Sequence, residues 1–330
     1  MRSRLTVVLI IALAGVLSAQ SQQGSIDAAQ QPRIYVYREI NGQKLNAHVF
    51  LPPGEGPGKP TSAILLFHGG GWSEGSAEWT FEDARRFTAL GMVAVAVDYR
   101  LSKGSITPIE ALDDSRAAFR WVRLHATELG IDPNRVAGHG VSAGGQLVTA
   151  AATIDFPDDK LGKTSSKPDL LLLWSPALDV AADGWFARLL QGRAKASDLS
   201  PLEHAGASTP PTSIVNGDKD TLTPLSKAER FRDRVIRSGG VCELNVYPGV
   251  GHLLTRNLAN QLSDFDPHPE FRADGKARHE RFLRERGYIS IVEIDFPEGL
   301  AEYVEKSRQS NTRCRRNESG RHKGSKVLTF

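Results

Sequence analysis

The sequence predicts one α/β domain with a mostly parallel central sheet and helices on both faces. Short, wholly apolar segments at 63–67, 92–97 and 170–174 are typical of strands that are covered on both faces. These segments alternate with longer amphipathic ones, a pattern that predicts crossover helices between parallel strands. The 330 residues are 40% hydrophobic, which allows a sizeable core.

The elements follow in order along the chain. Two strands at 34–40 and 44–51 are predicted to form a hairpin, because Asn41-Gly42 between them is a strong turn signal. The later predicted strands are 63–67, 92–97, one beginning at 135–137, 170–174, 213–215 and 243–247. The predicted helices are 78–90, 108–129, 146–152, one from Thr223 as N-cap and Pro224 to about Arg237, and 274–286.

Residues 177–211 interrupt this alternation without a strand and carry Trp185 and Phe186 among polar residues. We expect them to form a small lid insertion over the carboxyl edge of the sheet, where open α/β sheets bind ligands. A long surface connection is the alternative.

The ends of the chain differ from its body. Arg2 and Arg4, the apolar run 5–17 and the small residues around 19–21 predict a signal peptide over 1–21, and hence a secreted or periplasmic protein without a stable membrane span after cleavage. We expect a flexible leader at 22–31, a catalytic domain at 32–290 and a basic C-terminal extension at 291–330, disordered from about 309.

Composition excludes some functions. The net charge of +3 is concentrated at the two ends, so the body is mildly acidic and does not predict a nucleic-acid partner. No His/Cys cluster has metal-ligand spacing, so we expect no metal, and no motif predicts a cofactor. Of the two cysteines, Cys242 begins a predicted strand and is expected to be a buried free thiol; a disulfide with Cys314 is the alternative.

The stretch GHGVSAGG at 138–145 places Ser142 between a predicted strand and a predicted helix. A nucleophile on such a sharp turn needs small neighbours two residues before and after it, and Gly140 and Gly144 satisfy this requirement. A flexible glycine turn is the alternative, but its position between strand and helix favours a nucleophile.

A second glycine run, His68-Gly69-Gly70-Gly71-Trp72, directly follows the first core strand. Glycines let backbone N–H groups face a substrate oxygen, so we predict an oxyanion hole formed by the amides of Gly70, Gly71 and Ala143. His68 is expected to brace this loop.

A serine nucleophile needs a general base and an orienting acid. His252, in YPGVGHLL after the last predicted strand, is the predicted base, whereas His139 belongs to the turn of the nucleophile itself. Asp220 in SIVNGDKDTLTP is the predicted acid; Asp218 and, more distantly, Asp179 are alternatives. The resulting order Ser, Asp, His is the one found in α/β-hydrolases.

These motifs occur together with VAVDYRL and the 111–145 block, in family order over about 60–255. The sequence resembles an α/β-hydrolase-fold serine esterase of the compact bacterial acetyl- and feruloyl-esterase-like group, which is related to the hormone-sensitive-lipase-like esterases. Two departures favour the compact group: Val141, not an acidic residue, precedes Ser142, and the acid motif is Gly-x-x-Asp.

The resemblance implies hydrolysis of carboxylic esters through an acyl-enzyme, with short-chain acyl, acetyl or feruloyl-type esters of small molecules or carbohydrates as substrates. Trp72, Trp185 and Phe186 are candidate substrate-binding residues. Two alternatives share this fold. A peptidase or amidase would use the same catalytic residues, and a binding protein could keep the fold without catalysis. The sequence does not predict an oligomeric state.

Overall fold

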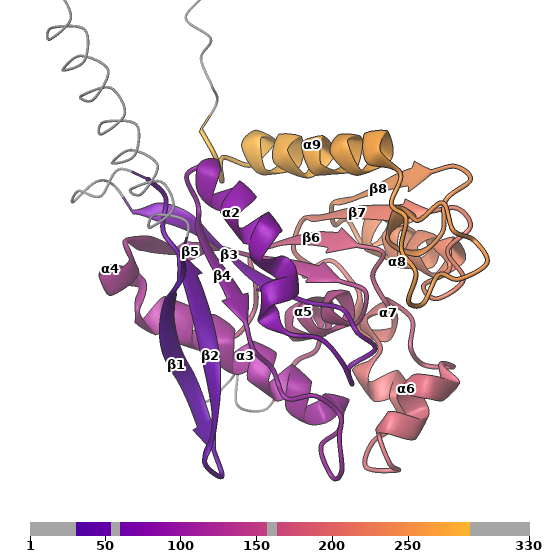
Figure 1. Ribbon diagram of the computed structural model, residues 1–330, viewed down its shortest axis with the longest axis horizontal. Helices are drawn as coiled ribbons and strands as arrows, with labels where there is room; N and C mark the ends of the chain where they lie inside the picture. Colours follow the sequence, from indigo (N-terminus) through magenta and orange to yellow (C-terminus); the bar gives the residue numbers. More distant parts are fainter. Residues whose placement is uncertain (1–30, 54–59, 157–163, 291–330) are drawn as a thin grey trace, which may run out of the picture. The chain divides into compact units, whose positions relative to one another are not determined.

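The computed structural model describes residues 31–53, 60–156 and 164–290 and contains an eight-stranded, mostly parallel sheet (Figure 1). The strand order is β1-β2-β4-β3-β5-β6-β7-β8. The predicted signal peptide, nearly all of the leader, the C-terminal extension and Cys314 lie outside the described residues. The α/β class and the mostly parallel sheet that the sequence predicted are therefore confirmed.

Only the first two strands depart from the parallel arrangement. β1 pairs antiparallel with β2 and β2 antiparallel with β4, whereas every pair from β4 to β8 is parallel. The carboxyl ends of β3 and β5 to β8 thus meet at one edge of the sheet. The strands are β1 (Arg33–Ile40), β2 (Gln43–Phe50), β3 (Thr61–Phe67), β4 (Val93–Val97), β5 (Ile131–Val141), β6 (Leu170–Trp174), β7 (Thr212–Gly217) and β8 (Cys242–Tyr247).

Helices cover both faces of the sheet (Figure 1). α2 (Phe81–Ala89) and α9 (Pro269–Glu285) pack on one face, and α3 (Pro108–Leu124), α5 (Ala143–Thr153) and α8 (Leu225–Arg237) pack on the other. Alternate residues of a strand point to opposite faces. Accordingly, Leu65 belongs to the core beneath α3, α5 and α8, while Ile64 belongs to the core beneath α2 and α9.

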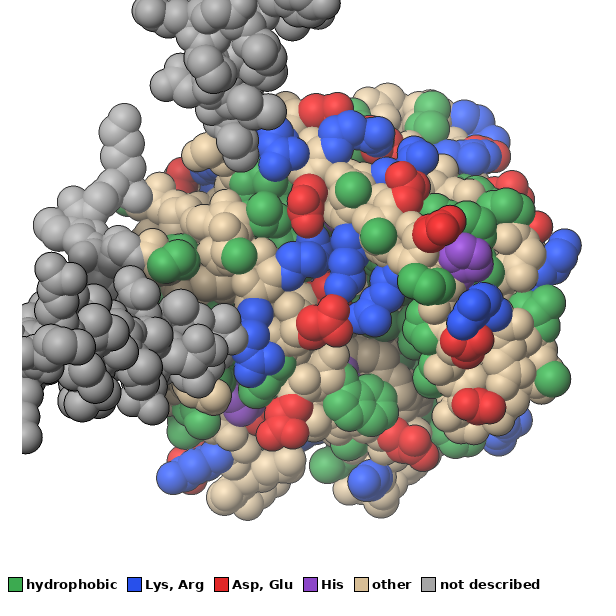
Figure 2. Space-filling model, turned by 45° about the horizontal axis from the view of Figure 1, so that its top comes forward, with side chains coloured by type: hydrophobic (Ala, Val, Ile, Leu, Met, Phe, Trp, Pro, Cys, Tyr) green, Lys and Arg blue, Asp and Glu red, His purple; other side chains and the backbone are tan. Residues whose placement is uncertain are grey.

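Ion pairs join the two helices of the α2/α9 face. Glu82 of α2 accepts from Lys276 at 2.7 Å and from Arg272 at 3.0 Å, and Arg86 pairs with Glu280 at 2.9 Å. The view with this side turned forward shows basic and acidic side chains interspersed (Figure 2). This mixture of signs differs from the continuous basic surface that binds nucleic acid.

Several helix boundaries differ from the predictions. The predicted helix 108–129 is interrupted at His125 and continues as the short α4 (Ala126–Leu129). α9 begins five residues earlier than expected, with Pro269 in its first turn. Glycine at position 275 lets α9 approach the sheet closely, because a Cβ there would lie 2.8 Å from the Trp174 ring.

The 177–211 insertion contains α6 (Gly184–Leu189), the 3₁₀ turn η3 (Ala196–Leu199) and α7 (Pro201–His204). Its apolar side chains Phe186, Leu190, Leu199 and Leu202 are buried in the core beneath α5 and α8. The insertion is therefore anchored to the main domain, because its apolar side chains are part of the same hydrophobic core.

Cys242 is a buried free thiol at the start of β8, and burial raises its pKa to about 12. Within 31–53, 60–156 and 164–290, every helix is too short or too polar to cross a bilayer.

Candidate active site

Ser142 lies on a strained turn between the end of β5 and the start of α5, with φ 52° and ψ −114°. A non-glycine residue adopts such angles only where the surrounding structure holds it there. A Cβ on Gly140 would lie 2.5 Å from the carbonyl oxygen of Gly144, and one on Gly144 would overlap the backbone of Phe67. The glycines around Ser142 thus provide clearance for tight packing, as the sequence predicted.

Three side chains from three loops meet at this edge of the sheet. Nε2 of His252 lies 3.0 Å from Oγ of Ser142, and Nδ1 of His252 lies 2.9 Å from Oδ2 of Asp220. Because the Asp220 carboxylate accepts from Nδ1–H, the lone pair of the imidazole is on Nε2, facing the serine hydroxyl. The geometry is that of a nucleophile, a base and an orienting acid.

The Asp220 carboxylate is fixed by its own loop. Its Oδ1 accepts hydrogen bonds from the backbone N–H groups of Leu222 at 3.0 Å and Thr223 at 2.8 Å, and the Thr223 hydroxyl lies 2.7 Å from Oδ2. Thr223 was predicted to cap α8, but the N-cap position is taken by Pro224. Thr223 instead helps to orient the acid.

Gln261, which no sequence motif indicates, joins the loop that carries Asp220 (the acid loop) to the loop that carries His252 (the base loop). Its side-chain oxygen accepts from the backbone N–H groups of His252 at 2.8 Å and Thr221 at 3.1 Å, and its amide nitrogen donates to the Lys219 carbonyl at 2.9 Å. Gln261 is only 6% exposed. No spacing in the sequence indicates these contacts, because Gln261 lies in a polar loop outside every motif.

The glycine loop after β3 presents free amides beside Ser142. Gly70 and Gly71 both have positive φ, 104° and 56°. The N–H groups of Gly70 and Gly71 donate no hydrogen bond to any described residue, and the N–H of Ala143, the first residue of α5, belongs to a helix turn that has no intrahelical acceptor. The Gly70 carbonyl accepts from Ser73 at 3.1 Å. Unpaired donors at a nucleophile are what an oxyanion hole requires.

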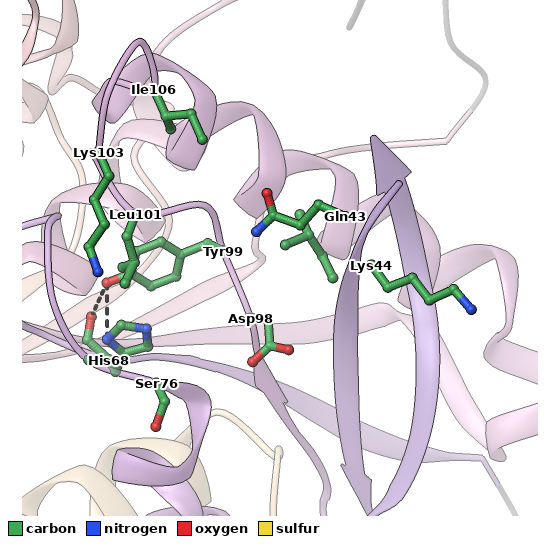
Figure 3. A pocket seen from close by; sticks show the side chains of 11 residues that line it. Gln43, Lys44, His68, Ser76, Asp98, Tyr99, Leu101, Lys103 and Ile106 are labelled. Carbon is green, nitrogen blue, oxygen red and sulfur yellow. Dashed lines mark hydrogen bonds between the residues drawn. The ribbon is translucent and has the colours of Figure 1, made fainter. Parts of the chain in front are cut away.

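His68 stabilises this loop from behind (Figure 3). Its ring stacks on Tyr99 with 4.3 Å between centroids, and the Tyr99 hydroxyl donates to the His68 carbonyl at 2.9 Å. Burial lowers the pKa of His68 to about 4, so the ring is neutral near pH 7. A second cavity, of about 340 Å³, lies on this side of the loop, next to Asp98 and Lys103.

The alternative residues have other partners. His139 projects to the α2/α9 face, where its ring packs against Phe87, and it does not reach Ser142. Asp218 accepts from the Gly249 N–H at 2.7 Å, and Asp179 pairs with Arg230 at 2.8 Å. Each is therefore engaged away from His252.

The three candidate substrate-binding aromatics are placed differently from one another. Trp72 is buried, donates from Nε1 to Gln146 at 2.9 Å and packs edge-on against the buried Phe186 at 4.7 Å. Trp185 is 46% exposed and donates to the Gly71 carbonyl at 3.2 Å. The structure therefore places only Trp185 at the surface, next to the glycine loop.

The cleft that opens onto Ser142 and His252 has a volume of about 530 Å³. Trp72 does not line it, and neither does Phe186 or any other residue of the 177–211 insertion. Its lining comes from the glycine loop, the 3₁₀ turn η1 (Ala77–Thr80), the turn at Ser142, the loops that carry Asp220 and His252, and residues 262–265: His68, Gly69, Gly70, Glu74, Trp79, Thr80, Val141, Ser142, Leu222, His252, Leu253, Leu262, Ser263 and Phe265. In the described part of the chain, no cluster of three potential metal ligands is present.

Two observations define the class of the protein: the strand order of the sheet, and a serine on a strand-turn-helix that lies within hydrogen-bonding distance of a histidine. Both are typical of an α/β-hydrolase with a serine nucleophile. A family model described as alpha/beta hydrolase fold matches residues 64–256, well over half of the chain. The chain belongs to the alpha/beta hydrolase fold family.

Several curated relatives are named as esterases. Over 132 residues the chain is 39% identical to carboxylesterase NlhH of Mycobacterium tuberculosis, covering 39% of this chain and 38% of the relative. It is 27% identical to esterase LipC of the same organism over 230 residues, or 59% of this chain and 54% of LipC. The chain thus spans about half or less of the length of these curated relatives.

A solved structure matches over more of its length. The thermophilic esterase Est2 of Thermogutta terrifontis superposes with a TM-score of 0.71 at 27% identity, covering 80% of this chain and 96% of Est2. Est2 has also been solved with bound propionate and with bound butyrate.

Proposed function

We propose that the protein is a carboxylic ester hydrolase that cleaves short-chain acyl esters through an acyl-enzyme. The observation that carries this proposal is the continuous relay from Asp220 through His252 to Ser142, with distances of 2.9 Å and 3.0 Å. The names of the relatives, carboxylesterase and esterase, support the same activity.

In this mechanism, Oγ of Ser142 attacks the ester carbonyl while Nε2 of His252 accepts its proton. The amides of Gly70, Gly71 and Ala143 bind the oxyanion of the tetrahedral intermediate. His252 then donates the proton to the leaving alcohol, and a water molecule activated by the same imidazole releases the acid. Asp220 stabilises the imidazolium throughout.

One observation supports short acyl groups. Est2 of Thermogutta terrifontis, a structural neighbour, has been solved with propionate and with butyrate. Acetyl esters, including carbohydrate-linked ones, are the finer candidates within this class. Feruloyl esters, whose acyl group is large and aromatic, are a separate candidate.

Covalent labelling tests the catalytic part of the proposal. A fluorophosphonate should modify Ser142, because Est2 is modified by organophosphates such as paraoxon. Ser142→Ala should abolish the adduct in folded protein. A wild-type protein that stays unlabelled would exclude an active serine hydrolase and favour a non-catalytic binding protein.

Rates on aryl esters of increasing acyl length test the substrate part. We expect acetyl to butyryl esters to be cleaved fastest, with acetylated xylan and feruloyl esters measured alongside. Faster cleavage of decanoyl than of acetyl esters would contradict the short-acyl proposal, and cleavage of anilides at comparable rates would favour an amidase.

We also propose that the protein is exported. The charged first residues Arg2 and Arg4 and the apolar run 5–17 support a cleaved signal peptide. Expression of the full chain with a reporter, followed by fractionation, should place it outside the cytoplasm.

A further inference from the structure

Large apolar side chains are exposed where the cleft opens beside His252. Leu222, Leu262 and Phe265 line the cleft and are 39%, 72% and 41% exposed. The Phe265 ring centroid lies 6.4 Å from that of His252, and Leu222 is in the loop that carries Asp220. Exposed apolar side chains gathered at a binding cleft are typical of a surface that a ligand covers.

Leu262 and Phe265 belong to a closed loop, residues 256–266. The backbone N–H of Arg256 donates to the Asp266 carbonyl at 2.8 Å, and the two side chains form an ion pair at 2.6 Å. Between these ends, Gln261 ties the loop to His252 and to the acid loop. The apolar side chains are therefore held in a fixed position relative to the imidazole.

The position of His252 determines which part of an ester this surface meets. When the tetrahedral intermediate collapses, the bond between the carbonyl carbon and the alcohol oxygen breaks, and its electron pair stays on that oxygen. The oxygen takes the proton from Nε2 of His252, so it must lie beside the imidazole. The group attached to it then extends toward Leu222, Leu262 and Phe265.

We propose that these three side chains form a subsite for the leaving group of esters of apolar alcohols, such as alkyl chains longer than ethyl, or benzyl alcohol. The proposal rests on the ester hydrolysis proposed above. Glu74 adds a carboxylate to the lining of the same cleft, which disfavours alcohols that carry a negative charge.

A series of acetates with one acyl group and alcohols of similar acidity tests the subsite: methyl, butyl, hexyl and benzyl acetate. A fully buried methylene changes an equilibrium by about fourfold. Because the three side chains stay partly exposed, we expect about twofold in kcat/KM for each methylene. The hexyl-to-methyl ratio of kcat/KM should then be roughly 30.

Leu262→Ser and Phe265→Ser should each lower that ratio by about fivefold or more. The matched control is Leu258→Ser: Leu258 is in the same loop and 46% exposed, but does not line the cleft. Leu258→Ser should leave both the ratio and kcat unchanged. Thermal unfolding of the three variants verifies that each is folded.

The outcomes separate this subsite from the activity on which it depends. A wild-type hexyl-to-methyl ratio near one, or equal effects of Leu258→Ser and Leu262→Ser, would overturn the subsite while ester hydrolysis stands. Absence of turnover on all four acetates, together with an unlabelled Ser142, would overturn both proposals.

Discussion

Replacing Gln261 by methionine should impair catalysis more than folding. Methionine has nearly the same shape but removes the acceptor of the His252 and Thr221 N–H groups. A buried donor left without a partner costs about 1–3 kcal/mol, so the two together cost at least about 2 kcal/mol. If this free energy is lost from the state in which His252 is aligned with Ser142, kcat falls by about 30-fold, since 1.36 kcal/mol corresponds to a tenfold change in rate.

The assay is steady-state hydrolysis of a short-chain acyl ester, with kcat and KM measured separately. Gln261→Met should lower kcat and change KM by less than about threefold, because the side chain does not line the cleft. Gln261→Glu keeps an acceptor for both N–H groups and should recover part of kcat. Its recovery is partial because a carboxylate oxygen replaces the donor to the Lys219 carbonyl and adds a buried negative charge.

Asn245→Leu is the matched control, because Asn245 is also buried and also donates to a backbone carbonyl, that of Ile214, at 3.1 Å. Its position in β8 is remote from the relay, so the variant should have a lower melting temperature and an unchanged kcat. The reasoning would be refuted if Gln261→Met kept kcat within twofold of the wild type, or if Asn245→Leu lost as much.

Three further changes should have distinct results. Asp220→Asn should lower kcat by about 10⁴-fold in folded protein, because the His252 tautomer is lost; activity within tenfold of wild type would contradict this. Gly144→Ala should prevent correct folding, measured by circular dichroism, because its Cβ meets the backbone of Phe67. Burial lowers the pKa of His139 to about 4 and that of His279 well below 6.5. As the pH falls, both imidazoles therefore become protonated in the unfolded chain before they do so in the folded protein. The unfolding free energy should therefore decrease by about 1.4 kcal/mol per pH unit for each histidine below pH 6.5, down to about pH 4 for His139; a melting temperature independent of pH there would contradict it.

Much of the fold follows from local sequence patterns. A strand such as β6, with five consecutive apolar residues, is recognisable because both of its faces are covered. The tight packing around Ser142 can also be inferred from the local sequence, since Gly140 and Gly144 occupy positions where any Cβ would collide with neighbouring backbone atoms. The loops after the last two predicted strands indicated which histidine and which aspartate to expect, and the structure brings the two side chains within hydrogen-bonding distance of each other.

The remaining features depend on contacts between distant segments. Gln261 resembles any other polar loop residue until the loop folds back onto Lys219 and His252. Trp72 follows the glycine loop directly, which suggested contact with substrate, but its indole instead pairs with Gln146 in α5. The sequence does not indicate these contacts, because each one depends on how two segments that are distant in the sequence pack against each other in the fold.

The loop beside His252 differs from the core next to the glycine loop. Trp72 and Phe186 are buried and pack against each other without lining the cleft, whereas Leu262 and Phe265 line it and remain exposed. A substrate group that pushed into the buried aromatic pair would displace core side chains, which costs about 1–3 kcal/mol. A leaving group that grows beside His252 covers apolar surface that is already exposed, and gains free energy by doing so. The enzyme should therefore accept larger groups in the alcohol part of the ester, with a preference for apolar ones.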